Sequence, residues 1–306
     1  MEVIKDFNTI VYHNPCADGS VALWVANYYK EIVEKIPCKA GYNPFIIANN
    51  KNILFVDICP KFDYLFELCK TAKNVVIIDH HQTTLDAYEK NKIENEYPKN
   101  LKLILDMKKS GCQMTWNYFF ETPYPWFVNY VGDKDLWLWK LPNSKEINIA
   151  FFENNMFDTQ YLHNINLLLN YTDEQINDLV KEGTLILKQQ KKQIDIASSR
   201  ALEAQIIVDD IKYNVWLGTI NSASNISELG NILANKPFTN TNNKPDFSAI
   251  WIYEPKTKEW WISLRGSETS PDLSKIAGVF GGGGHIKSSG FVIKYNKTLH
   301  DIFLIK

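Results

Sequence analysis

The sequence lacks the marks of exported, membrane-spanning and disulfide-stabilised proteins. Its five cysteines are odd in number and include no Cys-x-x-Cys pair, which argues against a disulfide framework or a structural zinc site. No apolar run is long enough to span a bilayer, and the N-terminal stretch contains acidic residues and leads into a strand-like segment, unlike a signal peptide. We therefore expect a soluble, cytoplasmic protein. Its thiols are expected to be reduced at Cys16, Cys38, Cys59, Cys69 and Cys112.

An excess of charge of either sign is also missing. The chain has 33 Lys and Arg against 35 Asp and Glu, for a formal net charge of −2 at pH 7. A protein that follows long duplex DNA needs a strongly basic surface, so we expect neither long duplex DNA nor a membrane as a partner. The charge balance is compatible with a short RNA or a dinucleotide held through a few phosphates. Self-association stays open.

What is present is a folded chain of 306 residues, 45% apolar and 22% charged, which is long enough for two domains. In its first half, short apolar runs alternate with segments of helical periodicity. The runs lie at 9–13, 53–57, 74–79 and 101–106, and the helix candidates at 19–36, 62–72 and 110–120. Ser110 is the expected N-cap of the last of these. This alternation predicts a mostly parallel sheet with helices on both faces.

The second half begins with a stretch, from about 150 to 205, that has no strand signals and is expected to be a helical connector. Strand candidates then return at 213–221, 247–253, 259–266 and 289–295, with helix candidates at 226–235 and 271–280. Ser270-Pro271 predicts the start of the last helix, with Ser270 as its N-cap. We predict an α/β chain of three parts: a parallel-sheet domain at 1–185, a linker helix at 186–205, and a smaller mixed α/β domain at 206–306.

Ionisable residues follow three of the predicted strands at the point where each ends. His13 ends the first strand, Asp57 the second, and Asp79-His80-His81 the third. Ligands of parallel sheets bind at the carboxyl ends of strands, so these side chains are expected to meet in one crevice. A single Asp at the end of a strand is explained by the capping of a turn, but three strands that all end in ionisable residues are not. Carboxylate with imidazole suits manganese, magnesium, iron or zinc.

Five motifs in order along nearly the whole chain resemble those of the DHH phosphoesterase family. They are YHNPCADGSVAL, LFVDICP, VVIIDHHQTT, VGDKDLW and, far downstream, FGGGGHIKSSGF. The resemblance implies a DHH domain that holds metal, followed by a DHH-associated C-terminal domain that binds substrate. A Cys in the first motif and Gly-Asp-x-Asp-Leu-Trp in the fourth resemble the NrnB-type oligoribonucleases.

The resemblance also implies a set of metal ligands. Asp57 would bridge two cations and take part in catalysis. Asp18, His80 and Asp133 would complete one site, and His13 would belong to the other. The expected ion is Mn²⁺, with Mg²⁺ or another divalent cation as the alternative, and one or two ions would bind.

Residues beside these ligands receive supporting roles from the same resemblance. Cys16 stands where the family elsewhere has Asp, and both metal ligation and simple packing remain open for it. Asp135 competes with Asp133 for the ligand position of the fourth motif; Asp133 is the favoured ligand, and Asp135 is then expected to brace the motif from behind the ligands. Asp79 is expected to orient the ring of His80. His81 is expected to face the phosphate or the leaving group as a catalytic residue.

The C-terminal motif predicts a substrate-binding loop. Four consecutive glycines lose considerable backbone entropy on folding, and such a run is typical where backbone closely approaches something, as around phosphate oxygens. A flexible linker is the alternative. The resemblance adds an Arg at the end of a strand, whose guanidinium suits a phosphate. The predicted substrate-binding residues are Arg265, Gly282, Gly283, Gly284 and His285.

Several tryptophans have two possible roles. Each can stack on a nucleobase or pack in the core, and packing is the commoner role of Trp. They are Trp137, Trp139, Trp251, Trp260 and Trp261.

Together these features predict a metal-dependent phosphodiesterase that hydrolyses short RNA from the 3′ end to nucleoside 5′-monophosphates. A phosphodiesterase for cyclic or linear dinucleotides and a bisphosphate nucleotidase are alternative enzymes with the same parts. A non-catalytic nucleotide- or RNA-binding homologue is a further alternative, which only Cys16 favours.

Overall fold

A computed structural model describes the chain except for residues 1–3, 95–96, 221–224, 240, 295–296 and 306. The chain forms two compact units, Met1–Ile186 and Leu187–Lys306. Each unit has its own sheet and its own hydrophobic core.

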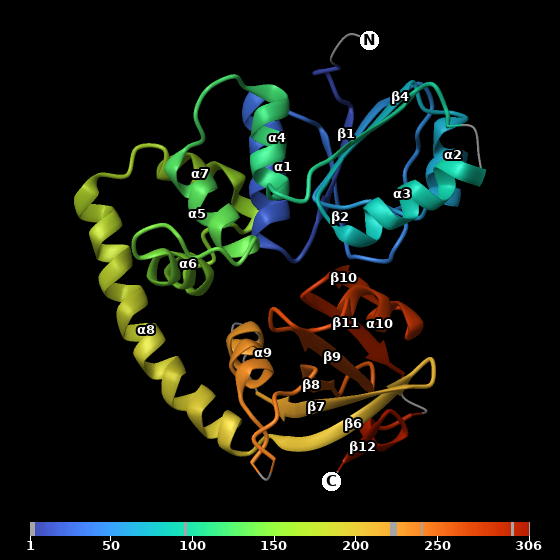
Figure 1. Ribbon diagram of the computed structural model, residues 1–306. Coiled ribbons are helices and arrows are strands. Elements are labelled where there is room, and N and C mark those ends of the chain that lie inside the picture. Colours follow the sequence, from blue (N-terminus) through green and yellow to red (C-terminus); the bar gives the residue numbers. More distant parts are fainter. Residues whose placement is uncertain (1–3, 95–96, 221–224, 240, 295–296, 306) are drawn as a thin grey trace. The chain divides into compact units, whose positions relative to one another are not determined.

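The first unit is built on a sheet of five parallel strands in the order β2-β1-β3-β4-β5 (Figure 1). The strands are β1 (Thr9–His13), β2 (Glu34–Cys38), β3 (Asn52–Val56), β4 (Asn74–Asp79) and β5 (Leu101–Leu105). The central strands are almost completely buried, as in Ile53–Val56 of β3. Strands buried on both faces read as continuous apolar runs, and the predicted parallel sheet is confirmed.

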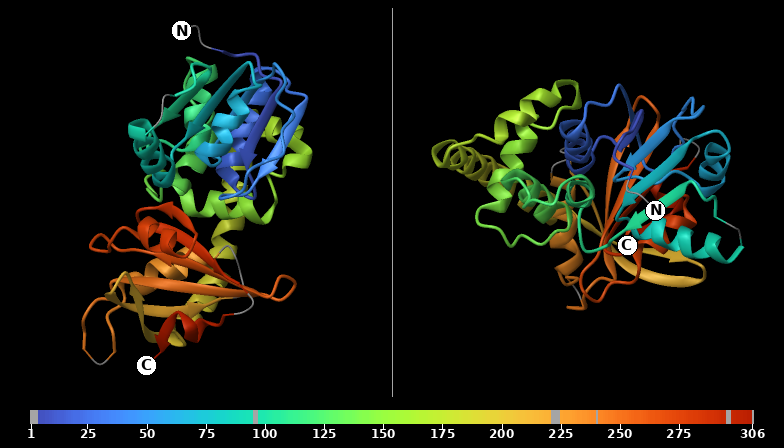
Figure 2. Two further views of the ribbon diagram at one scale, coloured as in Figure 1. Left: turned by 90° about the vertical axis from the view of Figure 1, so that its right-hand side faces the viewer. Right: turned by 90° about the horizontal axis from the view of Figure 1, so that it is seen from above.

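Helices cover both faces of this sheet, as the views in Figures 1 and 2 show. The helices of the first unit are α1 (Ala17–Tyr29), α2 (Phe62–Cys69), α3 (Gln82–Glu94), α4 (Gly111–Phe119), α5 (Trp126–Asp135), α6 (Ser144–Glu153) and α7 (Leu162–Leu168), with the short 3₁₀ turn η1 (Thr159–Tyr161). Helices α1, α4 and α5 share one core cluster, and α2 and α3 belong to the cluster on the opposite face. Two helix layers therefore enclose the sheet.

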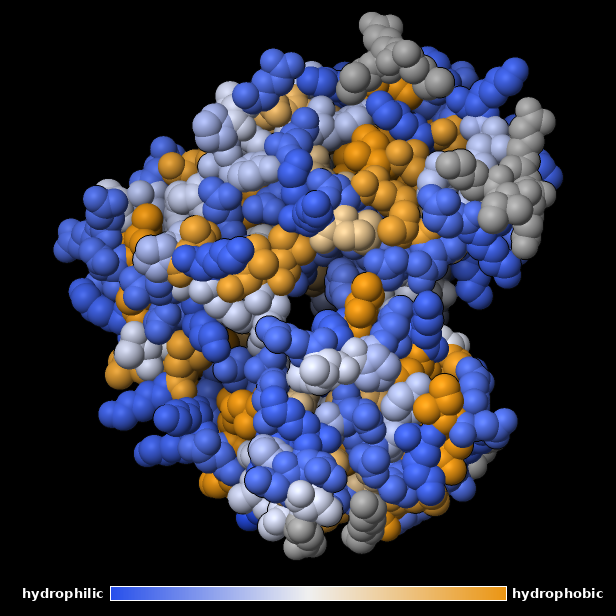
Figure 3. Space-filling view, viewed as in Figure 1, coloured by the Kyte–Doolittle hydropathy of each residue, from blue (hydrophilic) through white to orange (hydrophobic). Residues whose placement is uncertain are grey.

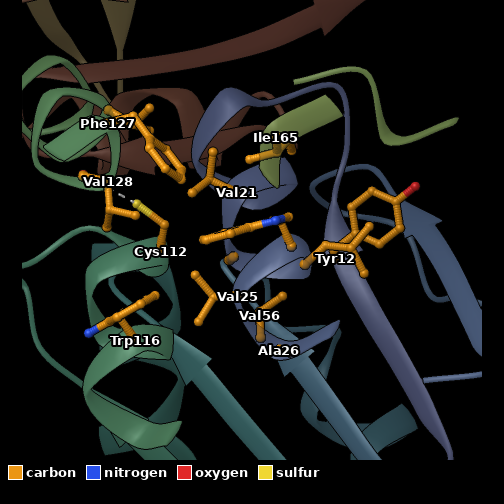
Figure 4. Packing of buried hydrophobic residues seen from close by; sticks show 14 of the residues in the cluster. Tyr12, Val21, Val25, Ala26, Val56, Cys112, Trp116, Phe127, Val128 and Ile165 are labelled. Carbon is orange, nitrogen blue, oxygen red and sulfur yellow. Dashed lines mark hydrogen bonds between the residues drawn. The ribbon is translucent and has the colours of Figure 1, made fainter. Parts of the chain in front are cut away.

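The contact between α1 and α4 forms the centre of the larger core (Figure 4). Val21 and Val25 of α1 lie against Cys112 and Trp116 of α4. The expected N-cap Ser110 is confirmed: its hydroxyl accepts from the backbone N–H of Gln113, whose side chain accepts in turn from the N–H of Ser110. This capping box fixes where α4 begins.

One element of the first unit differs from the sequence prediction. The helix expected over 19–36 ends at Tyr29, and β2 occupies Glu34–Cys38. Strand β2 contains Pro37 and lies at the edge of the sheet, where a missing N–H is tolerated. Its short, mixed sequence carries no strand signal of its own, so only pairing with β1 defines it.

The second unit has a seven-stranded sheet in the order β10-β11-β9-β8-β7-β6-β12, antiparallel except for the pair β7 and β8. The strands are β6 (Leu202–Val208), β7 (Ile211–Thr219), β8 (Phe247–Glu254), β9 (Glu259–Arg265), β10 (Gly283–His285), β11 (Ser288–Ile293) and β12 (Phe303–Ile305). Its helices are α9 (Ile226–Asn235) and α10 (Leu273–Val279), with the 3₁₀ turn η3 (Leu299–Asp301). The expected mixed α/β architecture is confirmed.

Two boundaries in this half differ from the prediction. The long helix α8 runs over Asp173–Ser199, and the division between the units falls inside it. Strand β6 begins at Leu202, where a helix was expected as far as residue 205, because pairing with β7 overrides the local helical pattern. Helix α10 begins after Asp272, whose carboxylate caps Ser274 N–H, so Ser270 is not the N-cap.

Within the described part of the chain, no helix combines the length and the apolar character that crossing a bilayer requires. The face seen in Figure 3 is mainly hydrophilic, with smaller hydrophobic areas between the polar side chains.

Candidate metal centre

The strand order of the first unit creates a switch point between β1 and β3. These strands are neighbours in the sheet although β2 lies between them in sequence, and α1 and α2 leave to opposite faces. Ligands of such sheets bind beyond the carboxyl ends of the strands at this point. His13 ends β1, Asp57 follows β3 directly, and His80 follows β4 directly.

Asp57 lies at the centre of the resulting cluster. Its Oδ2 is 3.2 Å from Nδ1 of His13, and its Oδ1 is 3.0 Å from Nε2 of His80. The same His80 nitrogen is 3.6 Å from Oδ2 of Asp18 and 3.4 Å from Oδ2 of Asp135. Asp18, Asp57 and His80 are buried, so water screens their charges little. One carboxylate thus joins two imidazoles, as a ligand shared between two ions would.

The N-terminus of α4 holds Asp18 in place. The backbone N–H groups of Gly111 and Cys112 donate to its two carboxylate oxygens at 2.5 and 2.9 Å. A helix N-terminus stabilises negative charge there. A Cβ at Gly111 would lie 2.6 Å from Cβ of Asp57 and 2.9 Å from Oδ2 of Asp18. Only glycine lets the helix approach both carboxylates this closely.

Asp57 itself has a left-handed backbone, with φ +57°. Its N–H donates to the carbonyl of Ile78 at 2.9 Å, which ties it to the neighbouring strand β4. Left-handed backbone is uncommon in residues other than glycine, although Asp tolerates it better than most. The local strain directs the carboxylate at the two histidines, and strain of this kind concentrates at functional sites.

Of the two carboxylates that compete for the ligand position in the fourth motif, Asp135 lies next to His80 and the favoured Asp133 does not. Asp135 contributes the carboxylate next to His80. The carboxylate of Asp133 accepts from the backbone N–H groups of Lys140 and Leu141 at 2.9 and 3.3 Å and so braces the loop after α5. Oδ2 of Asp135 is buried and accepts no hydrogen bond within the described residues. A buried oxygen of this kind is suited to a cation.

Asp79 orients a different histidine from the one predicted. Its Oδ1 is 2.7 Å from Nδ1 of His81, and its Oδ2 accepts from the hydroxyl of Thr84 at 2.5 Å. Toward His80 it accepts only the backbone N–H, at 2.9 Å. The expected support of the His80 ring by Asp79 is therefore wrong, and the Asp79–His81 pair takes its place.

The Asp79 carboxylate also sets the charge of His81. Burial works to lower the pKa of this imidazole, but the charge of Asp79 and its hydrogen bond outweigh burial and raise the pKa to about 9. The ring lies edge-on to that of His13, with centroids 5.7 Å apart. His81 is thus a cation at neutral pH, next to the carboxylate cluster.

The carboxylates of the cluster repel one another when no cation is bound. Burial, together with the charges of Asp135 and Asp57, raises the pKa of Asp18 to about 8. Burial also raises the pKa of Asp135. Burial acts to lower the pKa of His80, but its hydrogen bond to Asp57 and the charge of Asp135 raise it to about 10. The metal-free site therefore retains protons that a divalent cation would replace.

Within the first unit, three groups of side chains each have their ligand atoms within 4.8 Å of one another. They are His13, Cys16 and Asp57; Asp18, His80 and Asp135; and Asp57, Asp79 and His81. Carboxylates with imidazoles fit manganese, magnesium, iron or zinc. The residues therefore fit a divalent cation.

Cys16 lies among the possible ligands and precedes α1 without capping it. Burial and the charges of Asp57 and Asp135 raise the pKa of its thiol well above the usual range. The thiol is therefore neutral when no metal is bound. Its Sγ lies within 4.8 Å of ligand atoms of His13 and Asp57, and both metal ligation and packing stay open for it.

In the second unit, Arg265 ends β9 and is half-buried. Its guanidinium donates to the carbonyl of Leu264 at 2.8 Å and to the hydroxyl of Ser227 at 2.9 Å. It forms no ion pair with any residue that the structure describes in this unit. A Cβ at Gly230 would lie 2.5 Å from Cγ of Arg265, so this glycine makes room for the side chain on α9. Neutral acceptors hold the guanidinium of Arg265 in place, and a positive charge held in this way suits an anion as its ligand.

The glycine run approaches its own chain. Gly282 packs so closely on the carbonyl of Gly290 that a Cβ there would collide with it, and Gly284 has φ +136°. Residues 283–285 form β10, which pairs with β11. The interpretation of the run as a linker is wrong, and its close approach is explained by this hairpin. A substrate-binding role for Gly282, Gly283 and Gly284 stays a prediction.

The hairpin also aligns His285 with Arg265. His285 is opposite Ser288 in the pair β10–β11, and Ser288 is opposite Arg265 in the pair β11–β9. Directly paired residues direct their side chains to the same face of a sheet. His285 and Arg265 therefore share one face.

Comparison with known proteins gives two curated relatives. No family model matches the chain. An uncharacterized protein of Acanthamoeba polyphaga mimivirus is 30% identical over 303 residues, which cover 92% of this chain and 66% of that protein. Oligoribonuclease NrnB of Bacillus subtilis (strain 168) is 26% identical over 240 residues, which cover 74% of this chain and 54% of NrnB. These similarities support a DHH-type phosphoesterase family. The chain spans less than two thirds of the length of either relative.

Among solved structures, an exopolyphosphatase-related protein from Bacteroides fragilis matches 97% of this chain and 90% of its own, with a TM-score of 0.46 and 14% identity. In this chain, the Asp-His-His run is Asp79, His80 and His81. Asp79 contacts His81 and Thr84, and His80 contacts Asp57.

The structure brings most of the predicted DHH-type ligands together. His13, Asp18, Asp57 and His80 meet, and Asp135 joins them in place of Asp133.

Sequence reasoning missed two supporting residues of this cluster, Gly111 and Thr84. Gly111 directly follows the predicted N-cap Ser110, and Thr84 is the last residue of the third motif, so the sequence marks both positions although neither received a role.

Proposed function

We propose that this protein is a divalent-metal-dependent phosphodiesterase that hydrolyses short RNA oligonucleotides from the 3′ end and releases nucleoside 5′-monophosphates. The observation that carries the proposal is the convergence of buried carboxylates on His80 Nε2, with Asp57 also bound to His13. Similarity to a protein named an oligoribonuclease supports the choice of substrate class. The small net charge of −2 agrees with a short substrate.

The side chains of the cluster would hold the ion or ions. Asp57 has one oxygen toward each histidine, which suits a bridging ligand. Asp18 and Asp135 complete the group around His80. Mn²⁺ is the proposed cation; when bound, a divalent cation neutralises charge on the phosphate and lowers the pKa of a bound water.

His81 is proposed to act on the leaving group. Asp79 fixes one ring nitrogen of His81 and keeps the imidazole protonated. A positioned imidazolium can donate a hydrogen bond or a proton to the departing oxygen. The hydroxyl of Thr84 holds the other carboxylate oxygen of Asp79 and so keeps this pair in one orientation.

In the second unit, Arg265 is proposed to bind a phosphate of the substrate. Its guanidinium is held by Leu264 and Ser227 and keeps its charge, because even burial lowers its pKa only to about 10. His285 lies on the same face of the sheet and would assist.

A substrate panel tests this function. Purified protein with Mn²⁺ is incubated with labelled RNA dimers to pentamers, the matching DNA, cyclic and linear dinucleotides, and a bisphosphate nucleotide. We expect nucleoside 5′-monophosphates to appear first from the 3′ ends of short RNA. Asp57→Asn is expected to lose at least about a hundredfold in rate, as removal of a group that stabilises developing charge does. Asp195→Asn, at an exposed position of α8, is the matched control.

Faster turnover of cyclic dinucleotides or of bisphosphate nucleotides than of RNA would replace the proposed substrate. A folded protein that binds nucleotide equally well with and without Mn²⁺, and releases no mononucleotide, would instead be a non-catalytic binder.

A further inference from the structure

The loop that follows α5 contains two tryptophans in an unusual conformation. Trp137 and Trp139 have φ values of +56° and +53°. This region of backbone is rare for bulky side chains, and two instances so close together imply that the surrounding structure imposes them. The loop starts two residues after Asp135, whose carboxylate lies 3.4 Å from Nε2 of His80 in the proposed metal centre.

The end of α5 explains the conformation of Trp137. The N–H of Trp137 donates to the carbonyl of Lys134, and the N–H of Leu138 donates to the carbonyl of Asp133, both at 2.9 Å. This pair of bonds is the Schellman motif, in which the left-handed residue is usually glycine. Here the position is held by Trp137. Glycine would fit the backbone better, so the structure of the helix end does not account for the tryptophan.

The loop is also fixed on its other side. Asp133 accepts hydrogen bonds from the N–H groups of Lys140 and Leu141. The rings of Trp137 and Trp139 meet edge to face, with centroids 4.9 Å apart and an angle of 74° between their planes. Trp137 therefore presents an aromatic ring on a rigid backbone.

The exposure of the two rings differs. Trp137 is 37% exposed, whereas Trp139 is half-buried. The indole N–H of Trp139 is buried and has no acceptor within the described residues. Core packing thus explains neither ring well, because one is exposed and the other leaves a donor unsatisfied.

We propose that Trp137, supported by Trp139, is a stacking surface for the nucleobase of the nucleotide whose phosphate is bound at the cluster of Asp57 and Asp135. The inference rests on the proposed function and adds the recognition of a base to it. Trp137 follows Asp135 by two residues, so their Cα atoms lie at most about 7 Å apart. Stacking on an aromatic ring accepts every base, so the surface suits substrates of mixed sequence.

Two ligands that differ only in the base separate stacking from phosphate binding. Adenosine 5′-monophosphate and ribose 5-phosphate are titrated by calorimetry, in the presence of Mn²⁺, into the wild type, Trp137→Gly and Trp137→Phe. We expect the wild type to bind the nucleotide about tenfold or more tightly than the sugar phosphate. Trp137→Gly is expected to lose this preference while its affinity for ribose 5-phosphate stays within about twofold. Trp137→Phe is expected to retain most of the preference for the nucleotide.

Thermal unfolding of the same variants shows whether the protein remains folded. Because glycine suits the end of α5, Trp137→Gly is expected to melt at or above the temperature of the wild type. Unchanged nucleotide affinity in Trp137→Gly overturns the stacking surface. So does a wild type that binds both ligands equally, in which case phosphate binding stands. A wild type that binds neither ligand overturns the proposed function together with the stacking surface.

Discussion

The carboxylates of Asp133 and Asp135 lie on different sides of α5 although one residue separates them. Asp135 is 3.4 Å from Nε2 of His80, and Asp133 accepts from the N–H groups of Lys140 and Leu141. Successive helical residues are rotated by about 100°, so residues two apart face nearly opposite directions. One short motif thus serves two purposes: a ligand for the proposed metal centre and an anchor for the loop that carries Trp137.

This division predicts different outcomes for two matched variants. Asp135→Asn is expected to weaken Mn²⁺ binding by at least about tenfold, because a charged ligand becomes a neutral one. Asp133→Asn is expected to lower the free energy of unfolding by about 1–3 kcal/mol, because its hydrogen bonds to the loop lose their charge assistance. Its Mn²⁺ affinity should remain close to that of the wild type. Calorimetric titration and thermal unfolding measure the two quantities, and the reverse pattern would return Asp133 to the ligand set.

A second prediction concerns protons released on metal binding. With its pKa raised to about 8, Asp18 is mostly protonated at pH 7 in the metal-free protein, and the raised pKa of Asp135 acts in the same direction. A cation favours the ionised carboxylates, so Mn²⁺ binding at pH 7 should release protons. The release should shrink as the pH rises above about 8. Calorimetry in buffers with different ionisation enthalpies measures it, and binding without proton release would contradict the raised pKa values.

The Asp79–His81 pair predicts a pH dependence of stability in the metal-free protein. The pKa of His81 is raised to about 9 in the folded state, above its usual value. The contribution of His81 to stability is therefore fully present below the pKa that His81 has in the unfolded chain, and it is lost as the pH rises through about 9. Asp79→Asn is expected to lower the pKa of His81, as seen by NMR titration, and to remove this pH dependence. An unchanged His81 titration in that variant would show that Asp79 does not control it.

Gly111 offers a test of how closely α4 approaches the cluster. Gly111→Ala would place a Cβ 2.6 Å from that of Asp57, and we expect a loss of about 1–3 kcal/mol in the free energy of unfolding together with weaker Mn²⁺ binding. Gly278→Ala in α10 is the matched control, because a Cβ there meets no atom within 4 Å. That variant should be stabilised by about 0.4–1 kcal/mol. Equal effects of the two substitutions on stability and metal affinity would refute the close approach.

The sequence by itself determined the features that depend on local patterns. Apolar runs mark the buried strands. Residues that end a strand, such as His13, or directly follow one, such as Asp57 and His80, lie at its carboxyl edge in any parallel sheet. Ser110 followed by Gln113 marks the start of α4 for the same reason, since the capping bonds join neighbours in the chain.

Only the tertiary structure decided what depends on orientation between elements. Whether Asp133 or Asp135 faces the cluster follows from the rotation of α5 about its axis, which its neighbours set. Asp79 pairs with His81 in the short connection between β4 and α3. Strand β2, with Pro37, exists because β1 pairs with it. In each case, contacts between segments that are distant in sequence outweigh the local conformational preference. The free energy of packing depends on both elements together, so the sequence of one element alone does not reveal it.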